Sequence, residues 1–248
     1  MKLCRYKHDS PVSYAFGATL AYELLKVNPR LATRIFLRPN IKHGKDLEDI
    51  LSKISTQNIP IIESAKPFNI LGAKANCLLI AEFNKPTTSL RPTPKEPHLI
   101  LVNPSDAGNL GTIIRTAVAF NYNNLAIITP AVDHFDPKVI RASMGAIFHI
   151  NIETFSYFDE YLTKYANDSA TKRTLYSFML DQNATQLANI SPESANFALI
   201  FGNEASGLPK EYATKTNPVY IPQTPLVDSL NLSIAAGIAM YSLQPKNQ

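Results

Sequence analysis

The order of apolar and polar positions along the chain predicts strands that alternate with helices. Before residue 84, helices are expected near residues 15–27 and 45–54, and strands near 34–37, 59–62 and 77–81. After residue 97, strands are expected at 99–102, 125–128, 148–150, 174–179 and 198–201, and helices at 109–120, 159–166 and 229–243, with a further helix start at Asp136-Pro137. Strands alternating with helices imply a mostly parallel sheet with helices on both faces, so the fold class is α/β.

A proline-rich stretch at residues 84–97 (NKPTTSLRPTPKEP) separates two parts of the chain. Prolines at this density exclude a helix and favour extended backbone, and the stretch is almost without apolar residues. We therefore predict a small α/β domain at residues 1–83, a linker at 84–97, and a larger α/β domain at 98–248.

The composition is that of an ordinary globular protein, with 45% hydrophobic and 18% charged residues. Cys4 and Cys77 are too few for a disulfide framework, which favours a reducing compartment. The first residues (MKLCRYKHDS) lack the apolar core of a signal peptide, and no apolar run approaches the ~18 residues that a membrane helix needs. We expect a soluble cytoplasmic protein with no membrane segment.

Charge is distributed unevenly along the chain. Residues 1–98 hold 15 Lys and Arg against 8 Asp and Glu, a net charge of +7, whereas residues 99–248 hold 9 against 12, a net charge of −3. A basic first part suggests a polyanionic partner. A solvated lysine-rich surface would give the same balance, so charge alone leaves both interpretations open.

Three segments, 103–120, 197–209 and 219–243, each combine a strand, a polar loop and the start of a helix. The chain has 9 glycines in 248 residues, whereas an average usage of about 7% would give roughly 17. Five of the nine lie in these segments, at positions 108, 111, 202, 207 and 237. We infer that the three loops form a site where a ligand approaches the backbone closely.

The first two loops offer candidate polar groups. Asn109 is expected to cap the helix that follows it, and Arg115 comes six residues later. Arg115 could extend to solvent, or it could direct its guanidinium at a phosphate or hydroxyl group. Glu204 lies just beyond an apolar strand, where it could bind a ligand, clamp a neighbouring loop, or remain a solvated carboxylate.

In the third loop, Asp228 and Ser229 are suitable N-cap residues for the last helix. Asn231 is then expected inside an apolar helix, without a capping role, and it therefore needs a hydrogen-bond partner elsewhere. The five histidines are scattered without the spacing of a metal site or a catalytic triad, so no metal is expected.

These segments resemble the three motifs of the SpoU/TrmH family of RNA ribose 2′-O-methyltransferases, which belong to the SPOUT class of S-adenosylmethionine-dependent enzymes. The matching positions are Asn109, Gly111 and Arg115 in the first motif, residues 202–208 (GNEASGL) in the second, and Ile221, Pro222, residues 228–231 (DSLN) and Ala235 in the third. Residues 141–146 (RASMGA) also resemble the stretch between the first two motifs. Residues 1–83 resemble, more weakly, the substrate-binding domain that precedes the catalytic domain in ribosomal-RNA members.

The resemblance implies a C-terminal SPOUT domain with a deep trefoil knot. It also implies a homodimer formed through this domain, with the active site close to the subunit interface. Asn121 stands where the family commonly has a glycine at a helix end, and asparagine tolerates the left-handed backbone that such a helix end adopts.

S-adenosyl-L-methionine is the cofactor that the resemblance implies. Backbone around Gly202, Ile221 and Leu230 would hold its adenosyl part, and Ile200 would join Ile221 and Leu230 in an apolar wall for adenine. Gln223 replaces the usual methionine of the third motif, and Pro225 replaces the usual glycine, both on the cofactor side.

The resemblance also implies catalytic roles. Arg115 would engage the target phosphate and 2′-hydroxyl, while Asn109, Glu204, Ser229 and Asn231 would shape the site. A guanidinium with a pKa above ~12 is a poor base, so we expect Arg115 to orient the hydroxyl and to stabilise the emerging alkoxide.

We therefore expect the chain to transfer a methyl group from S-adenosylmethionine to a ribose 2′-hydroxyl in RNA. The front domain and its charge favour ribosomal (23S) RNA over transfer RNA. A non-catalytic RNA-binding or ribosome-assembly factor on the same fold is an alternative, disfavoured because Arg115, Glu204, Ser229 and Asn231 are retained. No Gly-x-Gly-x-x-Gly follows a strand, which disfavours a dinucleotide-binding oxidoreductase.

Overall fold

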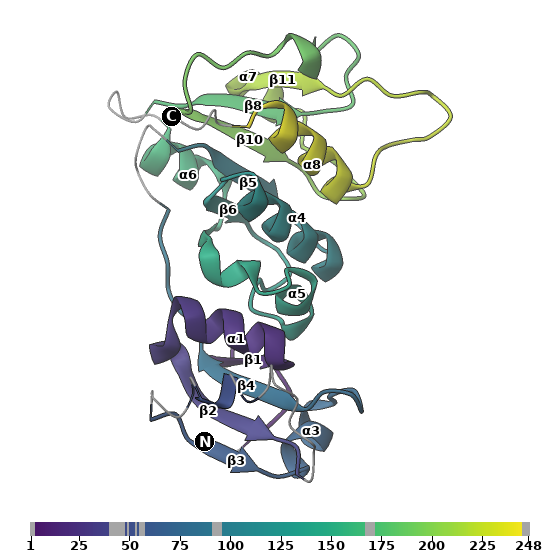
Figure 1. Cartoon of the computed structure of the whole chain (residues 1–248). Helices are drawn as coiled ribbons and strands as arrows, with labels where there is room; N and C mark the ends of the chain where they lie inside the picture. The colour runs from purple at the N-terminus through teal and green to yellow at the C-terminus, as the bar shows by residue number, and fades with distance from the viewer. Residues whose placement is uncertain are drawn as a thin grey trace. The chain divides into compact units, whose positions relative to one another are not determined.

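The computed structural model describes residues 3–39, 48, 50–52, 54, 58–90, 96–166 and 172–244 (Figure 1). Contacts divide the chain into two compact units. The first unit takes its described residues from the ranges 1–86 and 133–149, and the second takes its own from 87–132 and 150–248. Residues 133–149, which the sequence assigns to the second domain, thus group with the first unit. The domain boundaries 1–83, 84–97 and 98–248 stay a prediction.

The first unit is built on a four-stranded sheet in the order β1-β4-β2-β3. β4 pairs antiparallel with β1 and with β2, and β3 pairs parallel with β2. The strands are β1 (Val12–Phe16), β2 (Ala32–Leu37), β3 (Ile61–Glu63) and β4 (Leu79–Asn84), and the helices include α1 (Ala18–Val27), the 3-10 turn η1 (Pro29–Leu31) and α3 (Lys66–Leu71). The sequence missed β1 and α3, and most of the helix expected at 45–54 lies outside the described residues.

Residues 133–149 add α5 (Pro137–Ala142) and a 3-10 turn, η2 (Ala146–His149), to the first unit. Asp136 is the N-cap of α5, because its Oδ1 accepts a hydrogen bond from the Lys138 N–H at 2.7 Å, and this confirms the predicted helix start. The apolar side chains of this segment are buried, namely Phe135, Val139, Ile140 and Ile147. The strand expected at 148–150 is wrong: η2 occupies most of these positions, and the next strand begins at Asn151.

The same segment is fixed to the rest of the first unit at specific points. The ring of Phe83 in β4 lies 6.2 Å from that of Phe135, between ring centroids. Lys85 Nζ lies 3.0 Å from Asp133 Oδ2. Gly145 has a φ of +86°, and a Cβ added there would lie 2.8 Å from the Cβ of Glu23 in α1. Glycine is therefore needed at position 145, both for its left-handed backbone and for the close approach of α1.

The second unit contains a seven-stranded sheet in the order β7-β6-β5-β10-β8-β11-β9, with parallel pairing throughout. This confirms the predicted α/β class. The strands are β5 (His98–Val102), β6 (Asn124–Ile128), β7 (Asn151–Phe155), β8 (Thr174–Phe178), β9 (Thr185–Gln186), β10 (Phe197–Phe201) and β11 (Asn217–Tyr220). The helices are α4 (Ala107–Ala119), α6 (Phe158–Tyr165), α7 (Tyr212–Lys215) and α8 (Leu232–Ser242), with a 3-10 turn, η3 (Leu187–Asn189).

Helices cover both faces of this sheet. Side chains alternate between the two faces along a strand, and Ile100, Ala126 and Ile200 share one buried cluster with the apolar side of α6. α4 and α8 pack against each other on the other side of the sheet (Figure 1). Asn121, just past the end of α4, has a φ of 63°, as expected for an asparagine that ends a helix. The trefoil knot stays a prediction.

The start of the predicted linker is anchored to β7. Thr88 Oγ1 donates a hydrogen bond to the Ile152 carbonyl at 2.5 Å, and Leu90 N–H donates one to Glu153 Oε2 at 3.0 Å. Residues 85–90 form no helix or strand, as the prolines predict. Among the described helices, none is long and apolar enough to cross a membrane.

Candidate active site

The three loops singled out in the sequence follow β5, β10 and β11. Because parallel strands end at the same edge of a sheet, the loops at their carboxyl ends meet there, and this edge is where α/β proteins commonly bind ligands. Hydrogen bonds join the loop after β5 to the loop after β10, and α4 to the residue just before α8. The predicted convergence of these loops is therefore confirmed.

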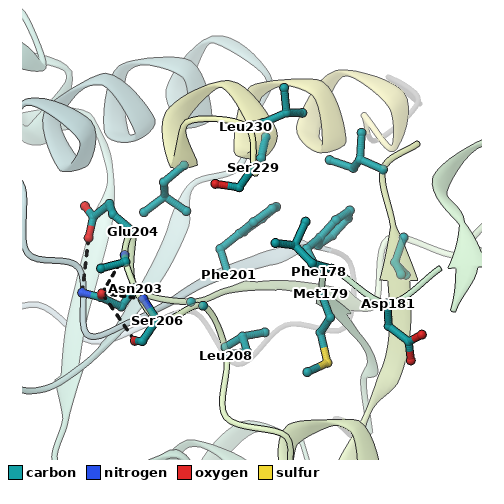
Figure 2. A pocket seen from close by; sticks show the side chains of 18 of the residues that line it. Phe178, Met179, Asp181, Phe201, Asn203, Glu204, Ser206, Leu208, Ser229 and Leu230 are labelled. Atoms are coloured by element: carbon teal, nitrogen blue, oxygen red, sulfur yellow. Dashed lines mark hydrogen bonds between the residues drawn. The ribbon is translucent and has the colours of Figure 1, made fainter. Parts of the chain in front are cut away.

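A cavity of about 750 Å³ opens at this edge. It is lined by residues from three stretches of the second unit, 178–182, 201–213 and 219–235. Figure 2 shows Phe178 and Phe201 side by side within it, with Ser229 and Leu230 on one side and Leu208 on the other. The rings of Phe178 and Phe201 stack with centroids 4.5 Å apart and planes 11° apart. The volume lies within the roughly 300–1,000 Å³ that is common for small-molecule sites.

Gly202 begins the loop after β10, and its own loop explains why no side chain fits there. A Cβ on Gly202 would lie 2.1 Å from the backbone carbon of Gly207 and 2.3 Å from the Leu208 nitrogen. The loop folds back on itself, since Gly207 N–H donates to the Asn203 carbonyl at 2.9 Å. The fold of the loop thus requires this glycine before any ligand is considered.

Glu204 holds the loop that leads into α4. Its Oε2 accepts hydrogen bonds from the Ser105 N–H at 3.1 Å and the Ser105 hydroxyl at 2.8 Å. Its Oε1 accepts bonds from the Asp106 N–H at 3.2 Å and from Asn109 Nδ2 at 3.3 Å. Of the roles left open by the sequence, the clamp on a neighbouring loop is confirmed.

These bonds also control the ionisation of Glu204. Partial burial opposes the charged form, but hydrogen bonds from its own backbone N–H, from Ser105 and from Asn109 outweigh that effect. The pKa of the Glu204 carboxyl therefore lies below its usual value. At neutral pH the side chain is an anion that accepts bonds from the loop.

Asn203, to which the sequence assigned no role, strengthens the same clamp. Its Nδ2 donates to the Asn103 carbonyl at 2.8 Å, and its Oδ1 accepts a bond from the Ala205 N–H at 2.9 Å. Figure 2 shows Asn203 beside Glu204 at the rim of the cavity. The sequence did offer a signal for this role, because Asn203 lies between Gly202 and Glu204 directly after an apolar strand, and asparagine side chains in such turns often bond to nearby backbone.

Asn109 links the second and third loops. Its Nδ2 donates to Glu204, and its Oδ1 accepts a hydrogen bond from Asn231 Nδ2 at 3.1 Å. Asn109 does not cap its helix as expected: the N-cap of α4 is Asp106, whose Oδ1 accepts a bond from the Asn109 N–H at 2.7 Å. The helix begins at Ala107, so the Asn109 side chain is available for the other loops.

Asn231 is the N-cap of α8, and the sequence expectation was wrong on this point. Its Oδ1 accepts bonds from the Ser233 N–H at 2.8 Å and the Ser233 hydroxyl at 2.7 Å. The helix therefore begins at Leu232 instead of Ser229. The expectation that Asn231 needs a partner outside its helix is confirmed by its bond to Asn109.

Six of the ten predicted site residues line the cavity: Gly202, Glu204, Ile221, Gln223, Ser229 and Leu230. Asn109 and Asn231 join them through hydrogen bonds. Ile200 lies in the buried cluster that packs against α6 and is not among the lining residues. Arg115 is exposed on α4 and also does not line the cavity of its own chain.

The model of the SpoU rRNA Methylase family matches residues 96–241, which is more than half of the chain. The chain belongs to this family. The SpoU match covers the whole site just described, from the strand before the first loop to α8. Among the described residues of this SpoU protein, no cluster of three His, Cys, Asp or Glu side chains could hold a metal ion.

The names of relatives of this SpoU protein refer to two kinds of RNA substrate. The 23S rRNA (guanosine(2553)-2′-O)-methyltransferase RlmP of Bacillus subtilis is 36% identical over 143 residues, which is 56% of this chain and 54% of RlmP. The tRNA (cytidine/uridine-2′-O-)-methyltransferase TrmJ of Shigella dysenteriae is 33% identical over 153 residues, 59% of this chain and 62% of TrmJ. The chain thus spans little more than half the length of these curated relatives.

Solved SpoU structures resemble nearly the whole chain. The AdoMet-bound rRNA methyltransferase from Sinorhizobium meliloti superposes with a TM-score of 0.79 at 25% identity, covering 94% of this chain and 86% of that one. AviRb from Streptomyces viridochromogenes gives a TM-score of 0.81 at 21% identity, covering 94% of this chain and 89% of AviRb, which shows a shared fold.

Proposed function

We propose that this chain is an S-adenosylmethionine-dependent RNA ribose 2′-O-methyltransferase that acts on ribosomal RNA in the cytoplasm. The observation that carries the proposal is the chain of hydrogen bonds from Glu204 to Asn109 to Asn231 at the rim of a ligand-sized cavity. It joins all three family motifs at one place. Ribosomal RNA is favoured as the substrate because RlmP and the Sinorhizobium meliloti protein are both named as rRNA methyltransferases.

The cavity suits an adenosyl cofactor. The stacked rings of Phe178 and Phe201, together with Leu208 and Leu230, give apolar surface for adenine. Polar groups for the ribose and the amino-acid part are present in Ser229 and Gln223, and Asp181 adds a carboxylate that would attract a cationic ligand. Backbone at Gly202, Ile221 and Leu230 lies in the same wall, and we propose that it holds the adenosyl part.

S-adenosylmethionine would supply an electrophilic methyl group, so the protein mainly has to position the ribose hydroxyl. The amides of Asn109 and Asn231 are fixed by the clamp, and Ser229 presents a hydroxyl to the cavity. We assign these three side chains to orienting the sugar. Glu204 acts as a positioning residue, because its bonds go to the loop before α4 and to Asn109.

Arg115 needs a second copy of the chain to meet a cofactor. It does not line the cavity of its own chain, and it lies on α4, which packs beside α8. Three apolar side chains on one face of α8 are exposed: Ile234 (54%), Ile238 (38%) and Tyr241 (70%). Exposed apolar stripes of this kind mark interfaces. We propose a homodimer through these helices, in which Arg115 of one copy reaches the cavity of the other.

The test is to incubate unmodified total RNA with the protein and methyl-labelled cofactor, and to map the labelled ribose. Label in 23S RNA is expected, and label in transfer RNA alone would favour the activity named for TrmJ. Arg115→Ala should lower turnover by about 10²-fold or more, with cofactor affinity nearly unchanged. No labelled 2′-O-methyl in any RNA would refute the enzymatic proposal.

A mixing experiment tests the dimer. Arg115→Ala and Gly202→Val should each have little activity alone, but the mixed dimer would contain one intact composite site. Recovery of activity on mixing is therefore expected. If mixing restores nothing while the variants exchange subunits, Arg115 does not act across the interface.

A further inference from the structure

Several cations gather at one end of the sheet of the first unit. Because β1 and β2 both run antiparallel to β4, their carboxyl ends lie at the start of β4, with Phe16 opposite Ile80 and Leu37 opposite Leu79. Basic residues lie around this end, and together they are called the basic sheet end: Arg5, Arg38, Lys74 and Arg141.

Arg38 directly follows β2, and its guanidinium lies over an aromatic ring. Its guanidinium carbon lies 4.5 Å from the ring centroid of Phe68, which is fully buried. Its Nε donates to the Cys77 carbonyl at 3.0 Å, and its Nη2 donates to the Lys74 carbonyl at 3.4 Å. A guanidinium has five N–H donors, so these bonds use two of them and fix the plane of the group. One side of the group lies over Phe68, and the Arg38 side chain is only partly buried, so it can meet a second planar partner.

Arg141 reaches the same end of the sheet from residues 133–149. It is exposed, and its guanidinium carbon lies 5.8 Å from the ring centroid of Phe16, the last residue of β1. Burial raises the pKa of the Cys77 thiol, and the charges of Arg38 and Arg141 both oppose that rise. Arg38 and Arg141 thus both contribute positive charge at this end.

The charge of the basic sheet end is mostly uncompensated. Arg5 and Lys74 are exposed, and Arg5 Nε donates to the Ile70 carbonyl at 3.4 Å. Glu63 ends β3 on the same side, because it pairs with Leu37 in the parallel β2–β3 ladder. No ion pair between described residues includes any of the four cations.

We propose that the basic sheet end docks unpaired nucleotides of the RNA substrate, with one base stacked on the outer face of Arg38 and with Arg5, Lys74 and Arg141 on the backbone phosphates. The inference rests on the proposed function for its substrate. Unpaired bases stack on guanidinium planes, and sequence-selective RNA binding favours loops over duplexes. Phosphates prefer clustered Arg and Lys.

The experiment measures RNA affinity of the full chain over a salt series, with a labelled stem–loop RNA and the blunt duplex of the same stem. Arg38→Lys keeps the charge but removes the plane, so it should weaken stem–loop binding about tenfold with an unchanged salt slope and little effect on the duplex. Arg141→Ala should weaken binding of both RNAs and reduce the salt slope by about one.

Arg30→Ala is the matched control. Arg30 is exposed in η1, before β2, and therefore lies at the opposite end of that strand. Its loss removes the same charge from the same unit but should change affinity less than about twofold, because salt screens charges that are farther apart than a Debye length. Thermal unfolding of each variant checks that it folds, and the exposed Arg141 keeps the test valid even if Arg38→Lys does not fold.

The proposal is overturned if Arg38→Lys and Arg141→Ala both bind the stem–loop as Arg30→Ala does. Such a result in a protein that still transfers methyl groups would leave the enzymatic function intact and remove only the docking surface. Conversely, the chain could transfer no methyl group while Arg38→Lys and Arg141→Ala still weaken RNA binding. That result would support the docking surface and refute the enzymatic function.

Discussion

Glu204→Gln removes the charge of the clamp while keeping its size. A glutamine has one oxygen, so its amide nitrogen must face either the Ser105 donors or the donors of Asp106 and Asn109. Two or three accepted bonds are lost, depending on the orientation, because Oε2 also accepts a bond from Asn203 Nδ2 at 3.4 Å, and the remaining bonds become neutral. Hydrogen bonds to a charged group contribute about 1.5–3 kcal/mol and neutral ones about 1 kcal/mol. Because the side chain is partly exposed and water replaces part of the loss, we expect the loop to be destabilised by about 2 kcal/mol.

Hydrogen exchange of the Ser105 and Asp106 amides measures this local loss directly, without assuming that two units unfold together. A loss of about 2 kcal/mol should accelerate their exchange roughly thirtyfold. The control is Glu211→Gln, which makes the same charge change at the exposed residue before α7, where no side-chain cap bond is made. Equal protection of both amides in Glu204→Gln and in the wild type would refute the clamp as the stabiliser of this loop.

Amide protection in the wild type and in Glu204→Gln should depend differently on pH. The pKa of Glu204 is lower in the folded protein, so its stabilising effect is complete above the unfolded-state value of about 4.3 and is lost as pH falls through the folded-state value. The difference in protection between wild type and Glu204→Gln should therefore be largest near neutral pH and shrink in acid. A difference that stays constant down to pH ~3 would contradict a role for the charge.

Three further substitutions have defined outcomes. Gly145→Ala puts a Cβ 2.8 Å from that of Glu23 at a φ of +86°; we expect about 1–3 kcal/mol of destabilisation of the first unit, measured by thermal unfolding, and an unchanged melting temperature would contradict this. Gly202→Ala places a Cβ 2.1 Å from backbone of Gly207; calorimetry should show at least about tenfold weaker cofactor binding, and normal affinity would show that the loop does not shape the cavity. Asn231→Ala should lower the stability of the second unit by about 1 kcal/mol, because it removes the N-cap of α8. Asn231→Asp keeps the cap and loses only the bond donated to Asn109, so it should cost less. Equal destabilisation by the two substitutions would contradict the capping role.

Most of the sheet of the second unit was predictable because its strands are short apolar runs between polar loops, whereas β9 is polar and exposed and was not expected. β5, β6 and β10 are buried on every residue, which produces a continuous apolar signal of the kind that buried parallel strands give. β7 was less clear, since only two of its five residues are buried. The loop residues were also predictable, because they are small or polar groups placed directly after these apolar runs.

The start of α8 was not predictable from local preference. Asp228, Ser229 and Asn231 are all good N-cap residues, so propensity cannot rank them. The decision comes from a residue distant in the sequence: Asn109 accepts a hydrogen bond from the Asn231 amide, while Ser233 donates to the same side chain. Likewise, no sequence pattern shows that residues 133–149 pack with the first unit, because their apolar spacing is the same for either partner.

Because residues 133–149 belong to the first unit, the first unit cannot be separated from the second by a single cut in the chain. Val139 and Ile140 are fully buried, and the helix that carries them lies against β1. A truncation that starts at residue 87 would leave this apolar helix without its sheet, and a fragment that ends at residue 86 would leave the sheet without its helix. Exchange of the first unit between family members during evolution would therefore require both of its segments, 1–86 and 133–149, to be replaced together.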